Sequence, residues 1–177
     1  MLKVKSGEIA RLGLLFERHH KSLFGFLVRI SGDPDLSEDM VQNVFEKILK
    51  NRKQFKGFGK FSTWMFSIAR NEWIDHIKKS NNRSHQKPSE EMLIDTRFTS
   101  AQMEEEKQDK LMVLEKAFTR LADEDKQLLA LTKYEGLSYR DAGSVLNISE
   151  GNARIRAYRA MHNLRTHFFE IEKQLTP

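Results

Sequence analysis

Apolar residues recur three and four positions apart along almost the whole chain, and runs that alternate Val, Ile and Thr with polar residues are missing. This spacing is typical of amphipathic helices, because one helical turn takes 3.6 residues. In the first half it predicts helices near 6–31, 35–53 and 61–80, the first of them with a break near Glu17. The pattern therefore indicates an all-α protein.

Turn and capping residues divide these helices. Asp35 and Glu38 resemble a capping box in which Asp35 caps the second helix, and Pro34 lies in the turn before it. Segment 54–61, "QFKGFGKF", holds two glycines, and we predict a loop there. Residues 1–80 are thus expected to form one small helical domain.

The second half of the chain is divided from the first by a polar segment. Residues 81–110 hold Pro88 and become acidic toward their end, which predicts a flexible linker that turns helical near Ala101. Fully extended, a linker of about 25 residues spans on the order of 80 Å, so two domains, 1–80 and 111–177, need not touch.

Residues 111–177 show the pattern of a helix-turn-helix unit. Ser138 with Asp141 is expected to cap one short helix, Ser149 to cap the next, and Asn147 to take the left-handed turn between them. Gly136 ends the helix before. Two short helices joined by about three residues, with the second one basic, are typical of DNA-binding proteins. The predicted helices are 101–121, 123–135, 138–146 and 149–168.

The last helix has a buried and an outward face. At 100° per residue, Ala153, Ala157, Ala160, Leu164 and Phe168 share the buried one. Arg154, Arg156 and Arg159 border the opposite face, which begins at the helix N-terminus. The arginine fork fits phosphate or the O6/N7 edge of guanine, and Ile155 suits a thymine methyl. A solvated basic helix would carry similar letters, so the helix-turn-helix frame is what favours DNA.

Composition supports an anionic partner and excludes several other classes of site. The net charge is +5, the pI is near 9.4, and the chain has no Cys, which excludes disulfides and thiolate metal sites. No apolar run approaches the roughly 18 residues of a membrane span, and the N-terminus does not resemble a secretory signal. The His positions do not fit a shared metal ion. We expect a cytoplasmic protein that is not an enzyme and has no cofactor or metal.

The segment "LADEDKQLLALTKYEGLSYRDAGSVLNISEGNARIRAYRAMHNLR" resembles region 4 of bacterial sigma factors of the sigma-70 family, extracytoplasmic-function (ECF) group. Ala142, Gly143 and Ala153 depart from the family pattern. Response regulators of the LuxR type end in a similar module, but their alternating strands and helices have no counterpart here. The resemblance implies that the helix-turn-helix reads the −35 promoter element through Ser149, Gly151, Asn152, Arg154, Ile155, Arg156 and Arg159.

Residues 36–79 resemble region 2 of the same family, through "SEDMVQNVF" and "FSTWMFSIARNEWIDHIKK". The resemblance implies that the polar side of helix 35–53 docks on the β′ clamp helices of RNA polymerase. The residues on that side are Asp39, Gln42, Asn43 and Glu46.

Loop 54–61 and the helix after it mix aromatic rings with cations. This mixture suits single-stranded DNA, because bases stack on rings while cations hold the backbone. Trp64, Ile68 and Met65 follow helical spacing and are expected in the core. Phe58, Lys60 and Phe61 are the candidates for meeting an unpaired base, because the two glycines expose their loop. The resemblance to region 2 implies that these residues bind and melt the −10 element together with Arg70 and Asn71, which match the part of region 2 that reads it.

Together the two resemblances imply an ECF sigma factor with two small helical domains. The expected partners are core RNA polymerase (β′ clamp helices and β flap), promoter DNA and an anti-sigma factor. Two alternatives stay open at this point: a free-standing helix-turn-helix regulator, and a sigma-like decoy that opens no promoter.

Overall fold

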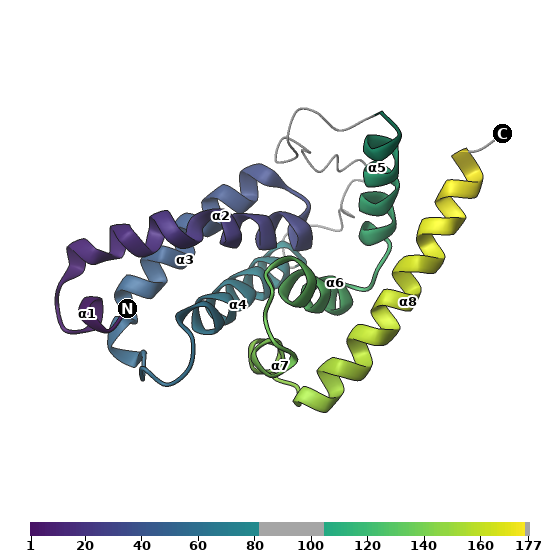
Figure 1. Cartoon of the computed structure of the whole chain (residues 1–177). Coiled ribbons are helices and arrows are strands. Elements are labelled where there is room, and N and C mark those ends of the chain that lie inside the picture. The colour runs from purple at the N-terminus through teal and green to yellow at the C-terminus, as the bar shows by residue number, and fades with distance from the viewer. Residues whose placement is uncertain (82–104, 176–177) are drawn as a thin grey trace.

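The computed structural model describes residues 1–81 and 105–175, and every regular element within these residues is helical (Figure 1). The all-α prediction is confirmed. The helices are α1 (Leu2–Lys5), α2 (Leu12–Ser31), α3 (Pro34–Lys50), α4 (Phe61–Asn81), α5 (Glu105–Thr119), α6 (Asp123–Leu129), α7 (Tyr139–Leu146) and α8 (Glu150–Leu175). Short 3₁₀ turns at Ile9–Arg11 and Arg52–Gln54 precede α2 and follow α3, and a π-helical turn, Ala130–Tyr134, extends α6.

Two details of the N-terminal prediction were wrong. The first helix is interrupted at Gly7, whose φ of 115° ends α1, whereas Glu17 lies inside the continuous α2. Helix α3 is capped by Asp33 instead of Asp35, since the Oδ1 atom of Asp33 accepts the Leu36 N–H at 3.0 Å. Pro34 then occupies the first helical position, where its missing N–H costs nothing.

The helix-turn-helix forms as its capping residues predict. The Ser138 hydroxyl accepts the Asp141 N–H at 3.1 Å, and the Ser149 hydroxyl accepts the Asn152 N–H at 3.2 Å. Asn147 has the expected positive φ, 58°. Helix α8 runs past the predicted end at residue 168, because Ile171 continues its buried face.

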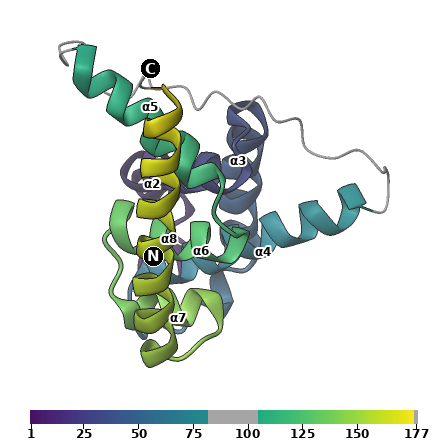
Figure 2. The ribbon, with the colours of Figure 1, turned by 90° about the vertical axis from the view of Figure 1, so that its right-hand side faces the viewer.

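The helices form two groups that pack against each other. Helices α2, α3 and α4 make one bundle, and α8 packs along α5, α6 and α7. In Figures 1 and 2, α6 and α7 lie between α4 and α8, and contacts join α4 to α7 and α2 to α6. One apolar core, which includes Phe26, Phe66, Leu128 and Leu131, therefore runs through both groups. Of the expected linker 81–110, residues 82–104 lie outside the described part.

Candidate nucleic-acid interface

Helix α8 turns the predicted face toward solvent. Ala153, Ala157 and Ala160 are completely or almost completely buried, Leu164 is buried, and Phe168 is partly buried. Ile155, on the opposite face, is 55% exposed. The helix is thus fixed by small buried residues, and its outward face is available for a partner.

Most residues predicted to read the −35 element are exposed at the start of α8. Gly151, Asn152, Arg154 and Arg159 are exposed, and so is Ser149 just before the helix, where its hydroxyl serves as the helix cap. The Nη2 atom of Arg154 lies 3.3 Å from Glu150 Oε1, a weak surface pair between adjacent helical turns. Arg154 can leave this pair at little cost.

Arg156 differs from the other two arginines. Its Nε donates to Asp125 Oδ1 at 2.7 Å and its Nη2 to Glu124 Oε2 at 2.5 Å, so both carboxylates come from α6. The hydrogen bond that Arg156 donates to Asp125 raises the pKa of Arg156 above its usual value, against the effect of burial and with the help of the bond to Glu124. Arg156 therefore fastens α8 to α6.

The loop before α4 presents one ring fully to solvent. Phe58 is 90% exposed and stands between Gly57 and Gly59, whose φ angles are 77° and 85°. A residue with a side chain rarely adopts these angles, so both glycines are needed for the loop to project Phe58 outward. The Phe58 ring is therefore accessible to a partner.

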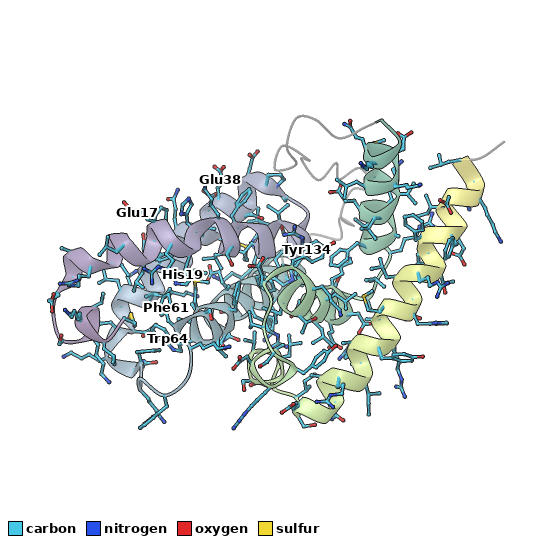
Figure 3. The ribbon with its side chains drawn as sticks, viewed as in Figure 1. Glu17, His19, Glu38, Phe61, Trp64 and Tyr134 are labelled. Carbon is cyan, nitrogen blue, oxygen red and sulfur yellow. The ribbon has the colours of Figure 1, made fainter. Side chains whose placement is uncertain are left out.

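Phe61 lies in a different environment from Phe58. It begins α4 and contacts His19 and Trp64, at ring-centroid distances of 5.1 Å and 6.2 Å (Figure 3). Burial, followed by the nearby charge of Arg18, lowers the pKa of His19. Phe58 and Phe61 were both predicted to meet an unpaired base. Phe61 is packed against neighbouring rings, whereas Phe58 is exposed. Met65 is buried, and Trp64 and Ile68 pack against the core, as predicted.

Two cations predicted to hold −10 DNA contact the C-terminal group of helices. The Lys60 Nζ lies 3.1 Å from Asp141 Oδ2 at the start of α7, and Arg70 Nε donates to the buried Gln127 Oε1 at 3.0 Å. Asn71, the next residue of α4, is exposed. Lys60 and Arg70 thus both face the C-terminal group of helices, Lys60 at α7 and Arg70 at α6.

The polar side of α3 forms a separate surface. Asp39, Gln42, Asn43 and Glu46 are all exposed, as predicted. A hollow of about 310 Å³ borders this side between α2 and α3, and Phe16, Phe24 and Val41 supply its apolar lining. An exposed polar row beside an apolar hollow is typical of a protein-binding surface.

Tyr158 is 78% exposed on α8, as its helical spacing outside the buried face predicts, although it is not among the predicted DNA-binding residues. The contacts between the two groups of helices were missed by sequence reasoning. At the contact between the two groups, Arg29 stacks 3.9 Å from the centre of the Tyr134 ring, and Ser22 donates a hydrogen bond to Glu135. Burial raises the pKa of Glu135, against the opposing effects of Ser22 and Arg29. No local pattern indicates which surfaces of two domains will meet.

Within residues 1–81 and 105–175, His, Asp and Glu side chains form no cluster of three that could hold a metal ion. Among the same residues, each helix is too short or too polar to serve as a membrane span.

Comparison with known sequences matches both halves of the chain to one family. The family description "Sigma-70 region 2" matches residues 15–83, and "Sigma-70, region 4" matches residues 111–164. The RNA polymerase sigma factor CarQ of Myxococcus xanthus is 27% identical over 161 residues, which cover 91% of each chain. The ECF RNA polymerase sigma factor SigM of Bacillus subtilis is 27% identical over 154 residues, or 85% of this chain and 91% of the relative.

Solved structures agree on the fold. The sigma factor RpoE in its complex with the anti-sigma factor NepR, from Bartonella quintana, superposes with a TM-score of 0.74 at 23% identity and covers 88% of this chain and 94% of its own. CnrH, solved with the cytosolic domain of CnrY, gives a TM-score of 0.69 at 22% identity, with 93% and 92% covered. With both regions matched in order over more than half of its length, the chain belongs to the sigma-70 family, as an extracytoplasmic-function sigma factor.

Proposed function

We propose that this sigma factor binds core RNA polymerase and directs initiation at promoters through a separate role for each domain. Residues 1–80 open and read the −10 element, residues 111–177 read the −35 element, and residues 81–110 connect them. The observation that carries this division is the exposed Phe58 loop in one domain and the exposed arginine face of α8 in the other.

At the −35 element, the N-terminal half of α8 enters the major groove. Arg154 and Arg159 reach phosphates or guanine edges, and Ile155 contacts a thymine methyl. Asn152 and Gly151 allow close approach at the start of the helix, beside the helix cap Ser149. Arg156 turns to DNA only if it leaves Asp125 and Glu124, so its first role is to orient the helix.

At the −10 element, Phe58 stacks on a base that has left the duplex. Stacking of a base on an aromatic ring contributes about 1–3 kcal/mol, comparable to the few kcal/mol that extruding a base costs. Lys60, Arg70 and Asn71 hold the separated strand, and Phe61 supports the loop from behind. Strand opening is thus a binding event, and this chain makes or breaks no covalent bond.

Contact with the polymerase uses other surfaces. The row of Asp39, Gln42, Asn43 and Glu46 docks on the β′ clamp helices, and the β flap meets the C-terminal domain. A hollow of about 450 Å³ beside α8, with Leu114, Met161 and Phe168 in its wall, suits an apolar flap segment. The chain acts in the cytoplasm, where the polymerase works.

An anti-sigma factor is a further partner. Both solved relatives named above are bound to a partner of this kind or to a cytosolic domain. Such a partner would compete with the polymerase for the exposed surfaces of α3 and α8.

Run-off transcription with core polymerase tests the proposal. Core enzyme plus this chain should give transcripts of defined length from genomic templates, and each single substitution Phe58→Ala and Arg159→Ala should reduce them. A free-standing regulator would bind DNA without conferring defined starts on core enzyme. A decoy would bind polymerase and yield no such transcripts, and either outcome would overturn the proposal.

A further inference from the structure

Helix α1 packs against the segment that leads into the Phe58 loop, although it lies outside the stretch matched to region 2, residues 15–83. The Lys5 ammonium group donates a hydrogen bond to the Phe55 carbonyl oxygen at 2.6 Å, across 50 residues of sequence. A charged donor on a partly buried carbonyl is one of the stronger hydrogen bonds in proteins.

Two neighbours of Lys5 strengthen this contact. Val4 is only 1% exposed, so α1 is seated on the protein by a buried side chain. The Leu2 side chain reaches Gly57, since a Cβ atom placed on that glycine would lie 3.0 Å from Leu2 Cδ2. A helix of four residues is not stable alone, so α1 is held by the loop that it contacts.

The base of the loop is consequently fixed on two sides. The Phe55 ring is buried and packs 5.2 Å from the Trp64 ring, while its carbonyl group is held by Lys5. Only after this anchor come Gly57, Phe58 and Gly59, which would otherwise sample many conformations. Ordering such a segment during binding costs free energy that a pre-ordered loop avoids.

We propose that α1 is a brace that holds loop 55–60 in place, and that Lys5 is a positioning residue for the capture of the −10 base by Phe58. The inference rests on the proposed function of Phe58. It assigns to residues 2–5 a role in promoter opening without contact with DNA.

The first test measures the loop itself. The chain contains no Cys, so Phe58→Cys allows a single nitroxide label at the loop tip. Lys5→Met should increase the mobile fraction in the electron paramagnetic resonance spectrum, and Lys5→Arg, which keeps a charged donor, should restore the original spectrum. Lys3→Met, on the exposed side of the same helix, should change nothing. An unchanged spectrum for Lys5→Met would overturn the brace.

The second test measures promoter opening in holoenzyme with Phe58 intact. At a promoter mapped with the unmodified chain, Lys5→Met should reduce permanganate reactivity of −10 thymines about fivefold, the equivalent of about 1 kcal/mol. Lys5→Arg should restore it, Lys3→Met should match the unmodified chain, and affinity for core polymerase and for a −35 duplex should stay unchanged. If Lys5→Met merely weakened the fold, the affinity for core polymerase and the affinity for the −35 duplex would also fall.

The outcomes separate the brace from the function on which it rests. Normal opening with Lys5→Met, despite a loosened loop, overturns the role in opening. Failure of the unmodified chain to open any promoter overturns the proposed function, while the nitroxide comparison still decides whether α1 restrains the loop.

Discussion

The Nζ atom of Lys60 lies 3.1 Å from the Oδ2 atom of Asp141, so the loop before α4 is joined to the first turn of α7 across 81 residues of sequence. Burial would raise the pKa of Asp141, but hydrogen bonds from Ser138 and Lys60 outweigh it and hold the pKa below its usual 3.8. An acid whose pKa falls on folding stabilises the native state above its usual pKa and loses that effect as the pH drops through the folded value.

Asp141→Asn should therefore lower the free energy of unfolding at neutral pH by about 0.5 kcal/mol, a small value because Lys60 is largely exposed. The difference from the unmodified chain should shrink as the pH falls below 3.8 and disappear once the Asp141 carboxyl group is protonated in the folded protein. Urea unfolding from neutral to acidic pH checks this, with the exposed Asp75→Asn as a matched control. If both substitutions lowered the free energy of unfolding equally at neutral pH, the ion pair between Lys60 and Asp141 would not stabilise the fold as predicted.

Arg156 and Arg159 should separate stability from DNA binding. Arg156→Ala leaves two carboxylates of α6 without their cation and should cost about 1 kcal/mol of unfolding free energy. Arg159→Ala, at an exposed site, should change stability by less than about 0.5 kcal/mol but weaken binding to a −35 duplex by about 1–3 kcal/mol. Removing Arg154 as well as both of these should abolish −35 binding.

Urea unfolding and fluorescence anisotropy with the same proteins measure the two effects. If Arg159→Ala destabilised the fold as much as Arg156→Ala, the distinction between an orienting and a reading arginine would be wrong.

Gly143 should be intolerant of a side chain. A Cβ atom at this position would lie 2.7 Å from the carbonyl oxygen of Ile148, and backbone cannot move aside as a flexible side chain can. Gly143→Ala should destabilise the helix-turn-helix by about 1–3 kcal/mol. Gly13→Ala, in α2 with open space around it, should leave stability unchanged or raise it by up to about 1 kcal/mol. Thermal unfolding of the two variants compares them directly, and an equally stable Gly143→Ala would contradict the close approach of α7 to the turn.

The helix pattern and its caps could be predicted from sequence because their causes are local. Ser138, Asn147 and Ser149 each act on backbone within three residues, so the helix-turn-helix follows from a short stretch of sequence. The cap of α3 was misassigned because Asp33 and Asp35 flank the same proline, and a pattern that starts from Asp35 ignores the preference of proline for the first helical position.

The contacts of the candidate site could not be predicted in the same way. Arg156 finds Asp125 31 residues away, and Lys60 finds Asp141 on the other domain. Such pairs depend on how helices pack, and no spacing rule connects them. The sequence predicted the exposed face of α8 and the Phe58 loop correctly, but it did not distinguish Phe58 from Phe61, whose burial is set by His19 and Trp64.

Promoter binding should depend steeply on salt. The basic face of α8 and the cations near α4 would neutralise DNA phosphates, and the affinity should fall with a log–log slope of about −0.9 per phosphate contacted. Arg159→Ala should reduce the magnitude of the slope if that side chain contacts phosphate. Titration of a promoter fragment with holoenzyme at several salt concentrations measures it, and a flat response would argue against the role in DNA binding.

The most direct test of the whole account maps the 5′ ends of RNA made by core polymerase on genomic DNA, with and without this chain. We predict a limited set of new start sites that share one sequence near −35 and another near −10, and that disappear when Phe58→Ala is combined with Arg159→Ala. A distribution of 5′ ends that is the same with and without the protein would contradict the claim that its two domains direct polymerase to promoters.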